Sequence, residues 1–167
     1  QQYTYNNAGE NTAKTDQAGN VFSYTRDAAG RITRIDVQRA AGFSGTTVQQ
    51  FRYNGLGGLT MTFDNNNPAD PSDDVTVTRV LDSLGRVLEE NQNGALVSMG
   101  YHSDISSPIQ LIYPNGDVAE YSFDSMNRET QIAYNGATVV EKSWIGQEKR
   151  VAQMVLPEPG GGDQAEQ

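Results

Sequence analysis

Apolar and polar residues alternate along much of this chain, which is the pattern of half-buried β-strands. In one segment Leu59, Met61 and Phe63 alternate with Thr60 and Thr62. A period of two places one set of side chains on one face of a strand and the second set on the other face. No window longer than a few residues has the periodicity of a helix. The pattern therefore predicts short β-strands throughout.

The strands are separated by a turn motif in which Asp or Asn stands three residues before Gly or Asn. The Asp or Asn oxygen can accept hydrogen bonds from backbone amides further on, and Gly takes the left-handed conformation without a Cβ penalty. Asn is the non-glycine residue that best tolerates that conformation. The turn-forming structural residues are therefore expected to be the pairs Asn6/Gly9, Asp27/Gly30, Asn54/Gly57, Asp82/Gly85 and Asp124/Asn127.

These turns recur with a period of 21 residues. Their last residues are 21, 27, 28 and 42 positions apart, and 42 is twice the period. Insertions near 40–50 and 64–75 account for the two longer intervals, and a degenerate repeat around SDISSP lies inside the interval of 42. A second turn motif divides each unit into two strands and is found at Asp16 to Gly19, Asn93-Gly94, Asn115-Gly116 and Asn135-Gly136.

A fixed period in this range indicates a repeat architecture. The predicted fold is all-β, an antiparallel β-hairpin repeat strip of about six 21-residue repeats that forms a spiralling or solenoid-like sheet. We expect the strip to span residues 1–143, followed by a C-terminal strand over 144–156. Residues 157–167 are rich in Pro, Gly and acidic residues, which predicts a tail or linker.

The segment YTRDAAGR has the pattern Tyr-x-x-Asp-x-x-Gly-Arg, and YTYNNAGE, VLDSLGR and YSFDSMNR follow it in part. This pattern resembles the YD repeat of the Rhs family, which is also found in the toxin-enclosing subunits of insecticidal complexes and in teneurins. The resemblance covers roughly residues 3–143. It implies a scaffold without catalytic residues of its own, whose β-strip spirals in large members into a hollow shell around a toxic C-terminal domain.

Two features depart from the large shells of that family. Such shells need many more than six repeats, and this chain has no Asp-Pro-x-Gly type segment of the kind that supports self-cleavage. Its one Asp-Pro pair, Asp70-Pro71, is followed by Ser72. Release of a toxin by this chain is therefore not expected.

Charge and composition exclude several classes of function. The chain has 12 Lys and Arg against 21 Asp and Glu, so nucleic-acid binding is not expected. Residues 1–60 carry a net charge of +2 and residues 61–167 a net charge of −11. The chain has no cysteine, which excludes disulfides and thiolate sites, and no apolar run long enough to span a bilayer.

Few residues are candidates for chemistry, and we expect no enzymatic activity. His102 is the only histidine, and we expect it to be an ordinary strand or loop residue. The recurring Asp residues already have a role in the turns. An acidic loop supplies hard oxygen ligands that suit calcium, although it lacks the spacing of an EF-hand, and its possible metal ligands are Asp64, Asp70, Asp73 and Asp74.

Two further side-chain patterns recur with the repeats. Aromatic residues form a ladder that we expect to stack on itself, with sugar binding as the alternative. Arg31, Arg86 and Arg128 follow the turn residue in three repeats, and we expect each to pair with an acid of a neighbouring repeat.

A repeat strip leaves unpaired edges at its ends unless it is capped. We therefore expect a secreted or bacterial cell-surface structural protein that self-associates end to end into a fibre or scaffold, with Val151, Met154 and Leu156 in a strand-donating interface. The first alternative is a segment of an Rhs-type shell enclosing a toxin, in which the partners are further repeats of a longer chain. The second alternative is a carbohydrate-binding adhesion module.

Overall fold

The computed structural model describes residues 1–104 and 106–156. The chain divides into two compact units, residues 1–95 and the residues from Leu96 onward. The predicted tail, residues 157–167, lies outside the described residues.

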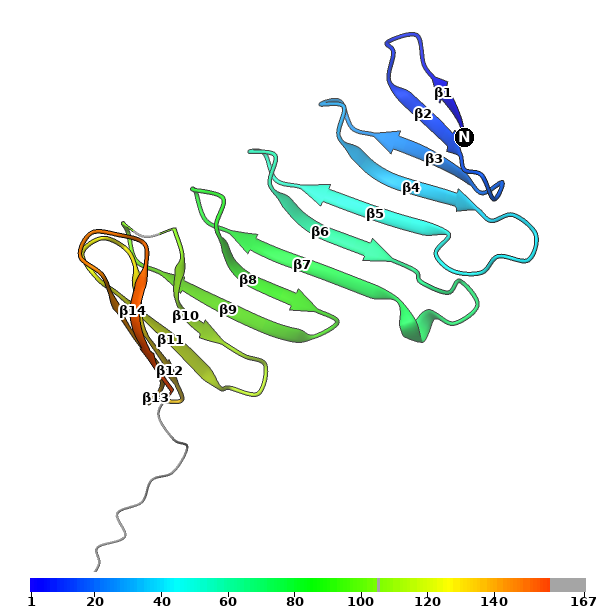
Figure 1. Ribbon diagram of the computed structural model, residues 1–167. Helices are drawn as coiled ribbons and strands as arrows, with labels where there is room; N and C mark the ends of the chain where they lie inside the picture. The colour runs from blue at the N-terminus through cyan, green and yellow to red at the C-terminus, as the bar shows by residue number, and fades with distance from the viewer. Residues whose placement is uncertain (105, 157–167) are drawn as a thin grey trace, which may run out of the picture. The chain divides into compact units, whose positions relative to one another are not determined.

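The first unit is a ladder of antiparallel strands whose order in the sheet is their order in the chain (Figure 1). Facing pairs such as Phe22 with Val37 and Tyr24 with Ile35 set the register and place aromatic and β-branched side chains on one face. The strands of this unit are β1 (Gln2–Tyr5), β2 (Asn11–Thr15), β3 (Val21–Arg26), β4 (Ile32–Gln38), β5 (Val48–Tyr53), β6 (Leu59–Asp64), β7 (Val75–Leu81) and β8 (Val87–Gln92).

The second unit has the same antiparallel arrangement. Its strands are β9 (Ala95–Tyr101), β10 (Pro108–Ile112), β11 (Val118–Phe123), β12 (Glu129–Tyr134), β13 (Ala137–Trp144) and β14 (Val151–Val155). Strands β9 and β10 pair where the degenerate repeat was expected, so that repeat keeps its hairpin without the usual Asp and Gly. The predicted all-β strip of antiparallel hairpins is confirmed.

Consecutive strands run in opposite directions, so the connections between them lie alternately along two sides of each unit. We use the word edge for each of these two sides. We call the edge that carries the β1–β2, β3–β4, β5–β6 and β7–β8 turns the turn edge, and the other the loop edge. The predicted insertions lie at the loop edge, as the β4–β5 and β6–β7 connections, and the second contains a 3-10 helix η1 (Pro71–Asp73). Strand pairing continues on both sides of each insertion, so the loops extend outward without interrupting the ladder.

Side chains are only shallowly buried. Among the described residues, the buried hydrophobic side chains are Val37 and Ala119, at 6% and 5% exposure, and none of the large side chains is completely buried. A globular domain of this size would pack a second layer over its sheet to form a core. Each unit is instead a single-layered sheet held together by its hydrogen-bond ladder and cross-strand contacts.

One feature of the described residues concerns membranes. None of the helices in that part of the chain is long and apolar enough to cross a bilayer.

Candidate functional site

The recurring feature of the molecule is a five-residue turn in which one carboxylate organises the backbone. The Asp27 Oδ1 atom accepts hydrogen bonds from the backbone N–H of Ala29 at 2.9 Å and of Arg31 at 3.0 Å. The Gly30 N–H donates to the Asp27 carbonyl, and Gly30 has a φ of 78°. Beyond the turn, Thr33 is an extra residue in β4, because Thr25 faces Arg34 and Arg26 faces Ile32, which makes a β-bulge.

The same bonds recur at the other turns assigned from the sequence. Asp82 and Asp124 repeat them with a carboxylate, and Asn127 takes the glycine position with a φ of 56°. Asn6 and Asn54 repeat them with an amide oxygen. Asp and Asn can replace one another at this position because the backbone amides require only one Oδ1 acceptor.

Two of the assigned turn glycines, Gly9 and Gly85, act through the backbone alone. Their φ angles are 78° and 81°, in the left-handed region. Gly9 donates its N–H to the Asn6 carbonyl and Gly85 donates to the Asp82 carbonyl, each at 3.0 Å. Both glycines are exposed, and a Cβ atom at either position would meet no other atom within 4 Å. The structure therefore places them at open turn tips and not in a packed site, and their requirement for glycine comes from φ and not from close contact.

Among the described residues, each of these arginines forms its ion pair with the acid of its own turn, so the expected pairing with a neighbouring repeat is wrong. Arg31 donates from Nε to the Oδ2 atom of Asp27, in its own turn, at 2.7 Å. Arg86 and Arg128 bind the acids of their own turns at the same distance. The Arg31 hydrogen bond is the main reason that the pKa of Asp27 lies below its ordinary value.

Arg31 and Arg128 also contact the next repeat, through an aromatic ring and backbone carbonyls. The guanidinium of Arg31 lies 4.7 Å from the centroid of the Tyr53 ring, and that of Arg128 lies 5.5 Å from the Trp144 ring. Arg128 also donates to the Gly146 carbonyl at 2.7 Å and the Glu148 carbonyl at 2.9 Å. The Asp27 and Asp124 turns are thereby joined to the following hairpins by cation–π contact and hydrogen bonding.

The polar groups of both aromatic residues bind backbone within the strip. The Tyr53 hydroxyl donates to the Ile32 carbonyl and the Trp144 Nε1 donates to the Glu129 carbonyl, each at 2.9 Å. Where the sequence suggested self-stacking or a sugar platform, Tyr53 and Trp144 therefore connect hairpins. Ring contact does occur between Tyr113 and Tyr134, whose centroids are 6.5 Å apart.

The second turn motif is of two kinds. Both residues of Asn93-Gly94 and of Asn135-Gly136 have positive φ, as expected of a two-residue hairpin turn. At Asn115-Gly116 only Gly116 has positive φ, and Gly116 donates to the carbonyl of Tyr113 as in the five-residue turns. The turn from Asp16 to Gly19 has that same five-residue geometry.

Asparagine side chains form a clasp at the loop edge that was not predicted from the sequence. The Asn93 N–H donates to the Thr76 carbonyl, while its Oδ1 accepts from the Thr76 N–H at 2.8 Å. Asn135 makes the same pair of bonds with Val118, and so does Asn65 with Val48. In all three clasps the partner stands 17 residues before the asparagine. This constant separation is the signal from which the clasps could have been predicted.

Three threonines were also missed. Each stands three residues after a turn glycine and donates its hydroxyl to the carbonyl eight residues earlier, across the bulge; they are Thr12, Thr33 and Thr60. These bonds use carbonyls next to the register shift.

The four candidate metal ligands do not converge. In the described part of the chain, no group of three or more His, Cys, Asp or Glu residues is placed to hold a metal ion. Asp64 accepts hydrogen bonds from Gln49 and Thr46; burial works to raise its pKa, but these bonds hold the pKa below its ordinary value. Asp70 and Asp73 use their carboxylates within the loop itself, and Asp74 ends the 3-10 helix of that loop.

Those three residues shape the connection around η1. Asp70 caps η1 by accepting from the Ser72 N–H at 3.0 Å, and Asp73 accepts from the Asn67 N–H at 3.2 Å. The Asp74 carbonyl accepts from the side chain of Asn93.

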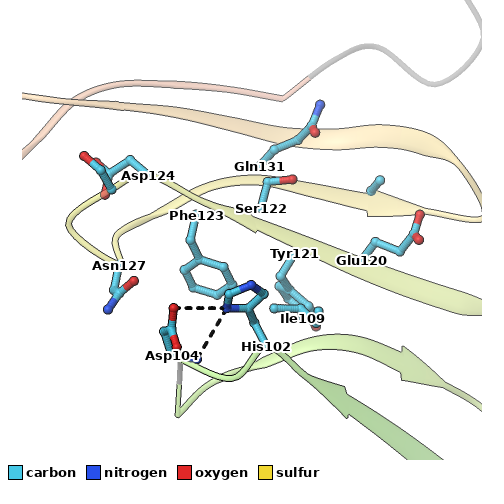
Figure 2. A pocket seen from close by; sticks show the side chains of 12 residues that line it. His102, Asp104, Ile109, Glu120, Tyr121, Ser122, Phe123, Asp124, Asn127 and Gln131 are labelled. Atoms are coloured by element: carbon cyan, nitrogen blue, oxygen red, sulfur yellow. Dashed lines mark hydrogen bonds and ion pairs between the residues drawn. The ribbon is translucent and has the colours of Figure 1, made fainter.

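His102 lies in the β9–β10 connection, beside an open depression of about 740 Å³ (Figure 2). Its Nδ1 accepts from the Asp104 N–H at 3.3 Å, and Tyr121 and Phe123 of β11 lie across the depression. The side chains of His102 and Asp104 are 55% and 79% exposed. General acid or base chemistry relies on a site shielded from water, and this pair is not shielded.

The residues of the predicted strand-donating interface lie in or beside β14. Strand β14 pairs with β13 of the same chain, with Val151 facing Trp144 and Met154 facing Lys142. All three side chains are exposed, Leu156 to 65%.

Comparisons with known proteins give a likeness of fold. No family model matches the sequence, and no curated protein matches it. A chain in the structure of the Photorhabdus luminescens Tc holotoxin pore with the TccC3-D651A mutation superposes with a TM-score of 0.51 at 14% identity, over 92% of this chain and 10% of that one. A chain of the TcdB2-TccC3-Cdc42 crystal structure matches with a TM-score of 0.28 at 10% identity, over 83% of this chain and 10% of that one. This chain therefore spans about a tenth of the chains it resembles, and the first of these likenesses supports the β-strip fold.

Proposed function

We propose that this chain is a non-enzymatic segment of a β-repeat wall, of the kind that encloses a toxin in Rhs-type shells outside the cell or at its surface. The observation that carries the proposal is the shallow burial. A single-layered sheet in which only two hydrophobic side chains of the described residues are buried is built as a wall and not around a core of its own.

The recurrence of the polar residues supports a structural role. The carboxylate binds the backbone of its own turn and the arginine of that turn in each of Asp27, Asp82 and Asp124. A catalytic or ligand-binding residue is needed once, whereas a turn residue is needed in every repeat. The fold likeness to a chain of a Tc holotoxin pore and the sequence likeness to YD repeats favour the same assignment.

Electron microscopy of the protein purified from its native source tests the proposal. A hollow particle whose wall contains the hairpin ladder is the expected result. A dispersed protein that forms no particle and belongs to no larger chain would contradict it.

A second candidate function is end-to-end association of strips through β14. It is favoured by the exposure of the whole strand, which pairs with β13 along one side and carries apolar side chains. An exposed edge of this kind can pair with a strand from another chain. A truncation that ends at Lys149 should reduce the particle size in solution, and an unchanged size would refute this candidate.

A further inference from the structure

The tips of the five-residue turns carry an apolar side chain at one fixed position, two residues after the Asp or Asn. The residues at that position are Ala8, Ala29, Leu56, Leu84 and Met126. In the first unit Leu56 is 80% exposed and Leu84 is 73% exposed, more than the other large hydrophobic residues described there. Two leucines that protrude from neighbouring turns cost free energy in water, and exposed apolar side chains that lie close together can form a contact surface.

Between these two tips the turn edge is hollowed. A depression of about 330 Å³ lies between the Asn54–Gly58 turn and the Asp82–Arg86 turn. Its lining includes Gly57, Gly58 and Leu81, and the tip leucines stand at its two sides. At Gly57 a Cβ atom would meet only the Arg31 Nη1 atom, at 3.8 Å, so an apolar group can approach the backbone there, whereas the Leu81 side chain already fills the space at Gly58.

This part of the edge therefore has a depression between two protruding side chains. Successive tips are two strands apart, which is about 9.5 Å, and the depression lies midway between them. A second copy of the edge, reversed and shifted by one strand spacing, places the same leucine of each copy in the depression of the other. A two-fold contact requires a surface that is complementary to itself in this way.

The charges of this edge permit such a contact even though the chain carries a net charge of −9. Asp27 is paired with Arg31 and Asp82 with Arg86, inside their own turns. The side chains of the second pair are only 15% and 22% exposed. Two turn edges can thus approach without opposing unpaired carboxylates from these turns.

We propose that the turn edge of the first unit is a self-complementary docking surface, and that its partner is the turn edge of a second copy of this chain. The contact joins strips side by side. It is independent of the proposed wall function and differs from end-to-end pairing through β14.

Sedimentation velocity of the purified chain over about a hundredfold range of concentration tests this proposal. The expected result is a monomer–dimer equilibrium that Leu84→Glu and Leu56→Glu each weaken about tenfold or more, because a buried charge replaces a buried leucine. Ala29→Leu adds a third protruding leucine and should strengthen the dimer. Circular dichroism checks that each variant keeps its fold, as expected for side chains so exposed.

Leu156→Glu is the matched control, because Leu156 is also exposed but lies beside β14. It should leave the dimer unchanged. A chain that stays monomeric at every concentration would overturn the proposal. So would a dimer that survives both turn-edge substitutions, or one that Leu156→Glu dissociates.

Discussion

Three glycines in the Asn54–Gly58 turn make one prediction that separates backbone strain from steric contact. Gly57 has a φ of 87°, and a Cβ there would meet only the Arg31 Nη1 atom, at an ordinary 3.8 Å. Gly55 lies outside the left-handed region and has open space around it. At Gly58 a Cβ would lie 2.5 Å from the Leu81 Cδ1 atom. Alanine therefore adds backbone strain at Gly57, steric contact at Gly58, and neither of these at Gly55.

The expected changes have different signs and sizes. Gly57→Ala should lower the free energy of unfolding by about 1–2 kcal/mol, the cost of a left-handed L-residue. Gly55→Ala should raise it by about 0.4–1 kcal/mol, because the unfolded chain loses conformational freedom without strain in the folded turn. Gly58→Ala should lower it by about 1–3 kcal/mol, because the Leu81 side chain must move.

Urea titrations followed by circular dichroism measure the three free energies against the wild type. The double variant Gly58→Ala with Leu81→Ala is the control for steric contact, since the smaller side chain should remove the clash and leave only its own packing loss. A Gly57→Ala variant as stable as the wild type, or a Gly55→Ala variant as unstable as Gly57→Ala, would refute the assignment of strain to the left-handed position.

Three further predictions concern the links within and between turns. In the same titration Asp27→Asn should destabilise the fold less than Asp27→Ala, because Asn keeps the Oδ1 acceptor and loses only the ion pair with Arg31. Equal losses in the free energy of unfolding would contradict this. The pKa of Asp27 is lowered on folding, so its contribution to the free energy of unfolding should be complete above the ordinary pKa of 3.8 and lost as the pH falls through the folded pKa. In a pH series, the free energy of unfolding of Asp27→Asn should therefore fall less in acid than that of the wild type. Trp144→Phe should cost about 1 kcal/mol in thermal unfolding, because the Glu129 carbonyl loses its indole donor, and no change in melting temperature would argue against that bond.

Most of the fold could be predicted from the sequence because the turn chemistry is local. The Asp27 oxygen and the Gly30 backbone act within five residues, so the motif itself specifies the hairpin. The alternation of apolar and polar residues then specifies the strands on either side. The predicted period survives even in the β9–β10 hairpin, where the motif is lost, because strand pairing alone maintains the ladder.

The partners of long side chains could not be predicted in the same way. Arg31 can reach an acid in its own turn as well as residues of the next repeat, and the geometry of the turn favours Asp27. The Asn65, Asn93 and Asn135 clasps join residues 17 positions apart, beyond any local rule. The hydrogen bond from Gln49 to Asp64 could not be predicted either, because that contact depends on the register of two paired strands.

The order of strands in each unit has a consequence for how the protein forms. Strands pair with their neighbours along the chain, so the contacts that define the sheet close short loops. Proteins dominated by such local contacts fold quickly, and repeat arrays can begin to fold at any unit and grow from there. A hairpin of this strip can therefore form while later residues are still being synthesised, and each completed hairpin offers a ready edge on which the next one assembles.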